Sequence, residues 1–305
     1  MQRRKVVVLA GGVGGARLAR GFDRVSDVNL TVIVNIGDDA WMHGVFVSAD
    51  LDTVLYTLAG IEGPHGWGRA DDTFNVMNES ERLGVDSRFM LGDRDLAFNL
   101  LRTTMIESDR TLTEFAARAR KVLGIRASVL PASDKRVATQ VLLNGEWIGF
   151  QEYFVERAHH DQIEDVRFVG ADESLPAPGV LDALRGADLT IIAPSNPILS
   201  IWPILAIPGI KEALKPAVAV SPLIGTQTVK GPAAANLEAL GLGTGHSAVV
   251  AAYEKVVPGL VKKLVVHRSD ANWSHPQVKS LSTNTLIGDP VEATRLAREV
   301  LEWGV

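Results

Sequence analysis

A continuous apolar run that ends in a cluster of glycines is the feature that most constrains the fold of this chain. Val6 to Ala10 are apolar, and four of the next five residues are glycines: Gly11, Gly12, Gly14 and Gly15. The stretch 16–22 that follows is compatible with a helix. A buried strand, a glycine turn and a helix start are how α/β proteins bring a phosphate against backbone N–H groups and the positive end of a helix dipole. The sequence therefore predicts an α/β fold with a phosphate-binding turn.

The spacing of these glycines matches neither common phosphate-binding motif. A dinucleotide-binding G-x-G-x-x-G starting at Gly12 would need glycine at Arg17. A P-loop starting at Gly11 would need glycine at Ala16 and Lys-Ser/Thr where Arg17-Leu18 stands. Arg17 lies one turn into the expected helix, where its guanidinium could bind a phosphate through two hydrogen bonds. A tight strand-to-helix turn without a ligand is the alternative.

Composition limits the classes of protein and chemistry. Of the 305 residues 46% are hydrophobic, and the formal net charge is −5, so we expect no nucleic-acid partner. The absence of cysteine excludes disulfides, thiolate metal sites and cysteine nucleophiles. No Gly-x-Ser-x-Gly motif anchors a Ser-His-Asp triad. No apolar stretch is long enough for a membrane span, and the first strand begins too early for a signal peptide, so we expect a soluble cytoplasmic protein.

Short β-branched runs, each followed by polar loop residues and a helical pattern, predict a mostly parallel sheet. Runs without alternation indicate strands covered on both faces, and the helices between them supply the crossovers. We therefore predict one Rossmann-like α/β domain over residues 1–305. The expected strands are Val6–Ala10, Leu30–Asn35, Leu189–Ala193, Ala217–Val220 and Leu264–His267, and the expected crossover helices are Gly179–Arg185, Ile204–Leu214, Ala233–Leu240, Ser247–Val256 and Val291–Glu302.

Two stretches interrupt this alternation. Residues 127–155 read as extended segments that flank Asn144-Gly145, a strong hairpin signal, and predict a small β-hairpin region. The expected strands of this hairpin are Val137–Leu143 and Trp147–Phe154. Residues 53–125 read instead as a helical insertion after the second strand. Its expected helices are Thr53–Ala59, Thr73–Arg82, Asp95–Met105 and Thr111–Leu123.

Carboxylates follow the second strand. In an open parallel sheet, ligands bind at the carboxyl ends of the strands near the topological switch point. Asp38 and Asp39 stand at such an end, and Asp50 and Asp52 follow shortly afterwards. Two carboxylates beside a phosphate turn suit Mg²⁺, which takes one or two carboxylates together with substrate phosphates and waters. The alternatives are a Gly-Asp-Asp turn and N-capping of a helix by one of the later aspartates.

Polar residues in other loops offer further candidates. Ser195 and Asn196, between two prolines at the end of an expected strand, suit hydrogen bonds to a base or sugar, or else form a plain turn. Arg94, between two acidic residues, is either a surface ion-pair partner or a ligand contact. Lys230 could meet a phosphate as a point charge or be solvated.

Nine motifs, in order along nearly the whole chain, resemble the 2-phospho-L-lactate transferase family (CofD, called FbiA in actinobacteria, with phosphoenolpyruvate transferases among its members). The motifs are Leu-Ala-Gly-Gly-Val-Gly-Gly-Ala-Arg (9–17), Val-Asn-Ile-Gly-Asp-Asp-Ala-Trp-Met-His-Gly (34–44), Asp-Leu-Asp-Thr (50–53), Gly-Trp-Gly-Arg (66–69), Leu-Gly-Asp-Arg-Asp-Leu-Ala (91–97), Leu-Pro-Ala-Ser-Asp (130–134), Phe-Gln-Glu (150–152), Ala-Pro-Ser-Asn-Pro (193–197) and Ser-Pro-Leu-Ile-Gly (221–225).

The resemblance implies a reaction in coenzyme F-420 biosynthesis. Members of this family transfer a phospholactyl or phosphoenolpyruvyl group from a GDP-linked donor to the ribityl 5′-hydroxyl of the deazaflavin Fo. They require Mg²⁺ and release GMP, and the product is F-420-0 or its dehydro form. Such a reaction needs charge neutralisation and alignment more than a protein nucleophile. The lack of cysteine and of a serine motif agrees with this chemistry.

The same resemblance assigns roles to single residues. The insertion at about 53–125 would form part of the acceptor pocket, with Trp41, Trp67 or Phe98 against the flat Fo ring. Archaeal members tend to have lysine where this chain has Arg94. The implied catalytic residues are Asp38 and Asp50; the metal ligands are Asp38 and Asp39; the donor-binding residues are Gly11, Gly12, Gly14, Gly15, Arg17, Ser195 and Asn196; and the Fo-binding residues are Asp50, Arg94 and Trp41.

Two other classes of protein share parts of this pattern. Gluconeogenesis factors, which are non-catalytic regulators that bind uridine-diphosphate sugars, have similar glycine and acidic loops, but the motif at 91–97 favours the transferase. An NAD-dependent dehydrogenase would place Asp38 or Asp39 on the ribose, but Arg17 at the third glycine position argues against it. Lactate, enolpyruvate and glycerate stay open as the acid of the donor. We expect a homodimer.

Overall fold

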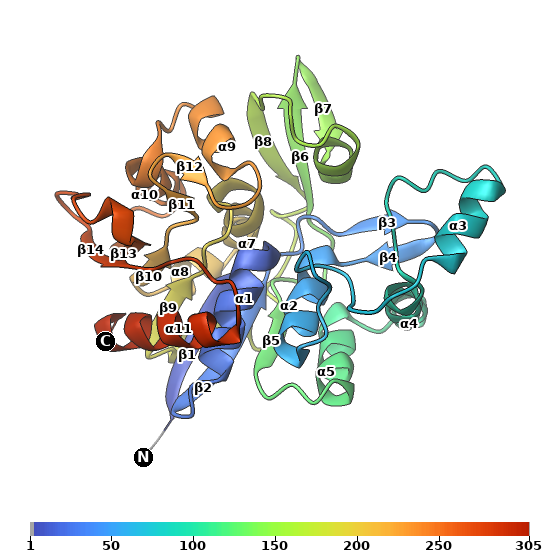
Figure 1. Cartoon of the computed structure of the whole chain (residues 1–305), viewed down its shortest axis with the longest axis horizontal. Coiled ribbons are helices and arrows are strands. Elements are labelled where there is room, and N and C mark those ends of the chain that lie inside the picture. Colours follow the sequence, from blue (N-terminus) through green and yellow to red (C-terminus); the bar gives the residue numbers. More distant parts are fainter. Residues whose placement is uncertain (1–2, 305) are drawn as a thin grey trace.

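A seven-stranded parallel sheet forms the centre of the computed structural model, which describes residues 3–304 (Figure 1). All neighbouring strands of this sheet run parallel. The predicted Rossmann-like α/β class is confirmed, and all five predicted strands belong to the sheet. From edge to edge the strands are β14 (Lys279–Thr283), β13 (Val261–His267), β10 (Ala217–Val220), β9 (Leu189–Ile192), β1 (Arg4–Ala10), β2 (Val28–Val34) and β5 (Ser128–Pro131).

The strand order places a topological switch point beside β1. The chain runs from β1 outwards through β2 to β5, then returns to β9 and continues outwards in the other direction to β14. Leu9 of β1 therefore lies between Ile33 of β2 and Ile192 of β9. The turns that follow these three strands meet at one end of the sheet, which is where a ligand crevice is expected in such a fold.

Helices connect the strands, largely where the helical patterns predict them. The single helix expected at Ile204–Leu214 is wrong, because Pro208 and Gly209, with a φ of +89°, separate two short helices. The helices are α1 (Gly12–Asp23), α2 (Ala49–Ala59), α3 (Asn75–Arg82), α4 (Asp93–Glu107), α5 (Leu112–Val122), α6 (Val180–Gly186), α7 (Trp202–Ala206), α8 (Ile210–Ala213), α9 (Ala233–Ala239), α10 (Gly245–Val256) and α11 (Pro290–Gly304), with the short helical turns η1 (Glu152–Glu156), η2 (Pro197–Ile201) and η3 (Arg268–Asp270).

α1 begins inside the glycine cluster rather than after it. The expected helix start at Ala16 is wrong by about one turn, since Gly11 is the N-cap and three of the four glycines lie in the first turn of the helix. α1 packs between α2 and α11 (Figure 1). Gly21 allows the close approach to α11, because a Cβ there would collide with the backbone carbonyl of Ala293. The glycine turn is thus part of a rigidly packed helix.

The helical insertion is confirmed, and its acidic residues join two of its helices. α3 projects away from the sheet at one end of the molecule (Figure 1). The Asp72 carboxylate accepts hydrogen bonds from the backbone N–H groups of Arg94 (2.8 Å) and Asp95 (3.0 Å) at the start of α4. Asp93 in α4 accepts one in return from Val76 (3.0 Å) at the start of α3. Each helix therefore receives its N-terminal cap from the other helix or its flank.

Small antiparallel sheets accompany the main sheet. The predicted Asn144-Gly145 hairpin is confirmed, and both residues have the positive φ (50° and 79°) that a type I′ turn requires. Its second strand was expected to run to Phe154 but ends at Gly149, and η1 follows. The paired strands are β3 (Ala40–Met42) with β4 (Val45–Val47), β6 (Ala138–Leu143) with β7 (Glu146–Gly149) and β8 (Asp165–Val169), and β11 (Leu223–Ile224) with β12 (Gln227–Thr228).

Candidate functional site

Asp50, in the first turn of α2, links the ends of β1 and β2. One of its carboxylate oxygens accepts a hydrogen bond from the Gly12 N–H at 2.6 Å, and the other accepts one from the Asn35 side-chain amide at 2.9 Å. The Asn35 side-chain oxygen in turn accepts one from the Gly37 N–H at 2.8 Å. Gly11 leaves room for this arrangement, since a Cβ there would lie 2.6 Å from the Asp50 carboxylate. Asp50 therefore holds the glycine turn against the loop after β2.

Asp38 in that loop has a carboxylate that its neighbours do not satisfy. The residue is 8% exposed, and its Oδ1 atom is buried without a hydrogen-bond partner among the described residues. Burial raises the pKa of Asp38 well above its ordinary value of 3.8, the negative charges of Asp50 and Asp39 raise it further, and the Asn35 side chain only partly opposes the rise. The Gln151 side chain donates to the Asp38 backbone carbonyl at 2.7 Å and fixes the loop. A buried carboxylate oxygen without a partner is rare, and a cation or a ligand hydroxyl would supply what it lacks.

Asp39 belongs to a second acidic group beside the first. The Ser48 hydroxyl donates to Asp39 at 2.8 Å. Asp52 forms an ion pair with Arg102, whose guanidinium is fully buried and also donates to the Phe46 backbone carbonyl at 3.0 Å. Burial raises the pKa of Asp39 well above its usual range, and it raises the pKa of Asp52 to about 7 although Arg102 opposes the rise. Asp39 is thus engaged with a serine, whereas Asp38 is not.

Packing against the loop after β9 explains two of the glycines. A Cβ at Gly14 would lie 2.6 Å from the Pro194 carbonyl oxygen, and one at Gly15 would lie 2.8 Å from the Ser195 hydroxyl. Gly12 differs, because its φ is +65° and a Cβ there would meet open space. The first N–H groups of an α-helix have no acceptor within the helix. The open side of the turn at Gly12 is therefore where a ligand can approach the start of α1.

Ser195 and Asn196, predicted to bind the donor, hold their own loop in place. The Ser195 hydroxyl donates to the Gly11 carbonyl at 2.6 Å and accepts from the Gly11 N–H at 3.2 Å. The Asn196 side-chain oxygen accepts from the N–H groups of Ile198 and Leu199 and caps η2. The Asn196 Nδ2 atom is buried and has no partner within residues 3–304. That amide is the part of the pair still available to a ligand.

The other predicted site residues have no hydrogen bond or ion pair with Asp38, Asp39 or Asp50 among the described residues. The Arg17 guanidinium donates to the Ile287 backbone carbonyl at 2.9 Å. Arg94 is exposed, and its side chain makes no hydrogen bond or ion pair with any residue that the structure describes. Trp41 is 47% exposed on the β3–β4 hairpin. Phe98, a candidate for the Fo wall, packs instead against the hydrophobic core.

A Ser–His–Asp hydrogen-bond chain, which the sequence analysis did not predict, lies at the ends of β10 and β13. Ser221 Oγ is 2.8 Å from His246 Nδ1, and His246 Nε2 is 3.0 Å from an Asp270 oxygen. The same Asp270 oxygen accepts from the Gly225 N–H at 2.8 Å. Ser221 is buried, and its hydroxyl also accepts from the Leu223 N–H, so it is not an accessible nucleophile. These hydrogen bonds hold the start of β11 and the turn of the β11–β12 hairpin.

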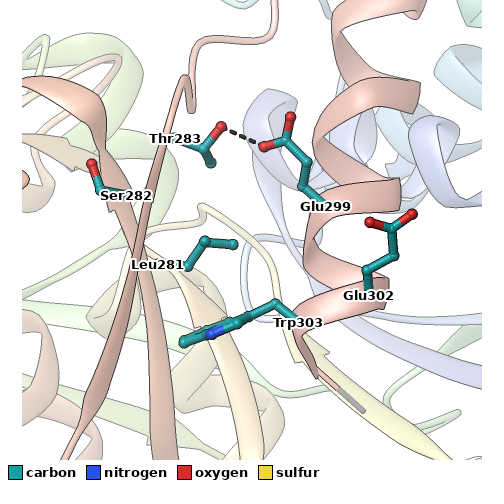
Figure 2. A pocket seen from close by; sticks show the side chains of 6 residues that line it. All are labelled: Leu281, Ser282, Thr283, Glu299, Glu302 and Trp303. Carbon is teal, nitrogen blue, oxygen red and sulfur yellow. Dashed lines mark hydrogen bonds between the residues drawn. The ribbon is translucent and has the colours of Figure 1, made fainter.

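A cavity of ≈ 400 Å³ between β14 and α11 lies away from this region (Figure 2). Three strands, β13, β10 and β9, separate β14 from β1 in the sheet. The cavity is lined by Leu281 and Trp303, among others, and its Glu299 carboxylate already accepts hydrogen bonds from Thr283 and Arg295. The candidate site is therefore the switch-point end of the sheet, with Asp38 at its centre.

Residues 3–304 contain neither a membrane-spanning helix nor a metal site made of protein side chains alone. No helix in this range is long and apolar enough to cross a membrane. No group of three or more His, Asp or Glu side chains in the same range could hold a metal ion. A site for Mg²⁺ would therefore have to take part of its ligands from a substrate, as Mg²⁺ sites at phosphates do.

Comparison with known proteins agrees with the geometry of the fold. A family model described as 2-phospho-L-lactate transferase CofD matches residues 6–297. The chain is 37% identical to a phosphoenolpyruvate transferase of Mycolicibacterium smegmatis (98% of each chain covered), and 39% identical to a 2-phospho-L-lactate transferase of Methanopyrus kandleri (97% of this chain and 96% of the relative). A phosphoenolpyruvate transferase of Streptomyces griseus is 43% identical (88% and 86%). The solved structure of protein BH3568 from Bacillus halodurans shares the fold, with a TM-score of 0.71, 21% identity, and 98% and 100% of the two chains covered.

Proposed function

We propose that this chain, which belongs to the 2-phospho-L-lactate transferase CofD family, transfers a phospholactyl or phosphoenolpyruvyl group from a GDP-linked donor to Fo. The chain is a transferase of coenzyme F-420 biosynthesis. The ribityl 5′-hydroxyl oxygen of Fo forms a bond to the phosphorus that carries the acid. The bond from this phosphorus to the GMP oxygen breaks, GMP leaves with the electron pair, and the hydroxyl proton is released. The comparisons give no support to a nucleotide-sugar-binding regulator.

The buried, unpartnered carboxylate of Asp38 carries this proposal. It stands at the switch point next to Asp50, whose other contacts fix the glycine turn at the start of α1. Phosphoryl transfer depends on positioning and on neutralisation of charge rather than on a protein nucleophile. A rigid turn with free helix N–H groups beside an unsatisfied carboxylate meets both requirements. Asp50 orients the turn, and Asp38 has the oxygen that is free to act.

The residues present fit a Mg²⁺ ion that is shared with the donor phosphates. The Oδ1 atom of Asp38, which has no hydrogen-bond partner among the described residues, and the adjacent charge of Asp50 form an acidic site suited to a cation. Mg²⁺ is commonly held by one or two carboxylates together with substrate phosphates, so Asp38, with Asp50 beside it, would hold the ion. When bound, the ion would neutralise the phosphates and the charge that develops on the leaving group. Asp39 and Asp50 are weaker candidate ligands than Asp38, since Asp39 accepts the Ser48 hydroxyl and Asp50 accepts from Gly12 and Asn35.

The test is turnover with defined donors. The protein is incubated with Fo, Mg²⁺ and one guanylylated donor at a time, carrying lactate, enolpyruvate or glycerate, and the product is identified by mass. We expect GMP and the phosphodiester of Fo with at least one donor. GDP with Mg²⁺ should also raise the thermal midpoint of unfolding, because a ligand that binds only the folded state stabilises it. No product with any donor, together with no shift at millimolar GDP, would overturn the proposal.

A further inference from the structure

Lys230, which follows the β11–β12 hairpin, is held by the loop before α3 rather than by an acidic residue. Its Nζ atom lies 3.9 Å from the centre of the Trp67 ring and donates to the His65 backbone carbonyl at 2.6 Å. The His65 ring stacks on Trp67 with centroids 5.7 Å apart. No carboxylate lies within ion-pair distance of Lys230 among the described residues. The ammonium group therefore lacks a counter-ion.

This contact lies beside the glycine turn. The loop that carries His65 and Trp67 packs on the first turn of α1, where Gly66, with a φ of +88°, lies so close to Val13 that any Cβ would collide with its side chain. Burial lowers the pKa of Lys230, and the positive charge of Arg17 in α1 lowers it further. Arg17 likewise has no acidic partner within residues 3–304. The described residues thus include one cation without an acidic partner in α1 and another held by the loop that packs on its first turn.

The β11–β12 hairpin that precedes Lys230 is held at the start of β11 and at its turn. Ser221, His246 and Asp270 form the buried hydrogen-bond chain described above, and Asp270 also binds the Gly225 N–H. Lys230 follows β12 by two residues and its side chain is exposed, so the ammonium group can exchange one partner for another. An ammonium on a flexible stem binds phosphate as a point charge. The aromatic face and a single carbonyl are weaker partners for it than a doubly charged phosphate group.

We propose that Lys230 binds the diphosphate of the GDP-linked donor, and that its contact with Trp67 is the resting position that it leaves when the donor enters. This inference rests on the proposed function, because it presumes a guanosine diphosphate at the glycine turn. Lys230 then faces the diphosphate from the α1 side of the site, while Asp38 belongs to the acidic side. Trp67 loses its cation when the donor binds, which makes this ring a reporter of the step.

The test measures GDP and guanosine affinities with Mg²⁺ by isothermal titration calorimetry. The proteins are the wild type, Lys230→Met, Lys230→Arg, and the control Lys255→Met, which removes a lysine from the face of Trp202 on another part of the molecule. We expect Lys230→Met to weaken GDP binding about ten- to a hundredfold, the range for loss of a hydrogen bond to a charged group. Lys230→Arg should restore most of the affinity, and Lys255→Met should match the wild type.

Guanosine separates phosphate binding from a structural effect. It lacks the diphosphate, so its affinity, and the thermal midpoint of the free protein, should change little in Lys230→Met. If Lys230→Met bound GDP with the same affinity as the wild type, the role of Lys230 would be overturned and the proposed function would stay intact. An equal loss of guanosine and GDP affinity would also overturn it, since Lys230 would then act on the shape of the site. Absence of GDP binding by the wild type would instead overturn the donor site itself, and this inference with it.

Discussion

Replacement of Asp38 by Asn should make the free protein more stable while it removes activity. Burial, then the charges of Asp50 and Asp39, raise the pKa of Asp38 well above 3.8 in the folded state. The folded state therefore holds this proton more tightly than the unfolded chain. The contribution of Asp38 to stability is fully present below pH 3.8 and is lost as the pH rises through the folded-state pKa. Asparagine has nearly the same shape and no such loss.

The size of the effect follows from the shift. Each pKa unit by which the fold raises Asp38 corresponds to about 1.4 kcal/mol of unfolding free energy that Asp38→Asn would recover at alkaline pH. The difference in unfolding free energy between Asp38→Asn and the wild type should therefore be largest near pH 8, decrease as the pH falls, and vanish near pH 4. Urea denaturation of both proteins at intervals of one pH unit measures it. Transfer to Fo should fall by at least about a hundredfold, the usual cost of removing one charge-stabilising group.

Asp93→Asn is the matched control, because the fold lowers the pKa of Asp93 whereas it raises the pKa of Asp38. Hydrogen bonds from Thr73, then from Val76 and Asn75, lower the pKa of Asp93 to about 2. Its contribution is present above pH 3.8 and is lost as the pH falls through about 2, so this variant should be less stable than the wild type at pH 7 and equal to it in strong acid. An Asp38→Asn protein that is less stable than the wild type at pH 8 would refute the electrostatic reasoning. Retained Mg²⁺-dependent turnover would remove Asp38 from the reaction.

Three further substitutions test the packing around the site, each by urea denaturation. Arg102→Met leaves Asp52 buried without its ion-pair partner and should cost about 3–5 kcal/mol; Arg102→Met with Asp52→Asn should recover much of this, and a cost below 1 kcal/mol in the single variant would contradict the ion pair. Gly14→Ala places a Cβ 2.6 Å from the Pro194 carbonyl and should cost about 1–3 kcal/mol, whereas no loss would mean that the turn is not close-packed. Ser195→Ala leaves the buried backbone groups of its partner glycine unpaired and should cost about 1–3 kcal/mol; an unchanged midpoint would show that water replaces the hydroxyl.

The sequence predicts those parts of the fold that depend on local signals. A central parallel strand is an unbroken apolar run, as from Val6 to Ala10, and the Asn144-Gly145 turn has a conformation that few other residue pairs adopt. At the two edges, β14 was not predicted, and β5 lies in a stretch predicted as extended but not assigned to the parallel sheet, because only partners distant in sequence make a short, half-exposed segment a strand of that sheet. β5 pairs with β2 across the whole helical insertion.

The sequence predicts at which end of the sheet the candidate site lies, but not which hydrogen bonds its side chains form. The rule that ligands bind at the carboxyl ends of strands located Asp38, Asp50 and Ser195 together. It could not tell which of these side chains would be engaged by the protein itself. Ser195 bonds to Gly11, a residue 184 positions away, and Asp50 bonds to Gly12. The Ser221 hydrogen-bond chain was missed for the same reason, although polar residues at the ends of the adjacent strands β10 and β13 were a usable signal.

Several charged groups near the glycine turn make the folded state less stable than it would be with a bound ligand. Burial raises the pKa of five carboxyl groups, with Arg102 as a buried cation beside Asp52; the five are Asp38, Asp39, Asp50, Asp52 and Asp95. Lys230 and Arg17 have no acidic partner within residues 3–304. Each group would be more stable with a ligand of opposite charge. A diphosphate between them, with Mg²⁺ toward the carboxylates and its own charge toward the cations, would satisfy both groups at once. A cation alone would stabilise only the carboxylates and an anion alone only Lys230 and Arg17, whereas a diphosphate with Mg²⁺ would stabilise both.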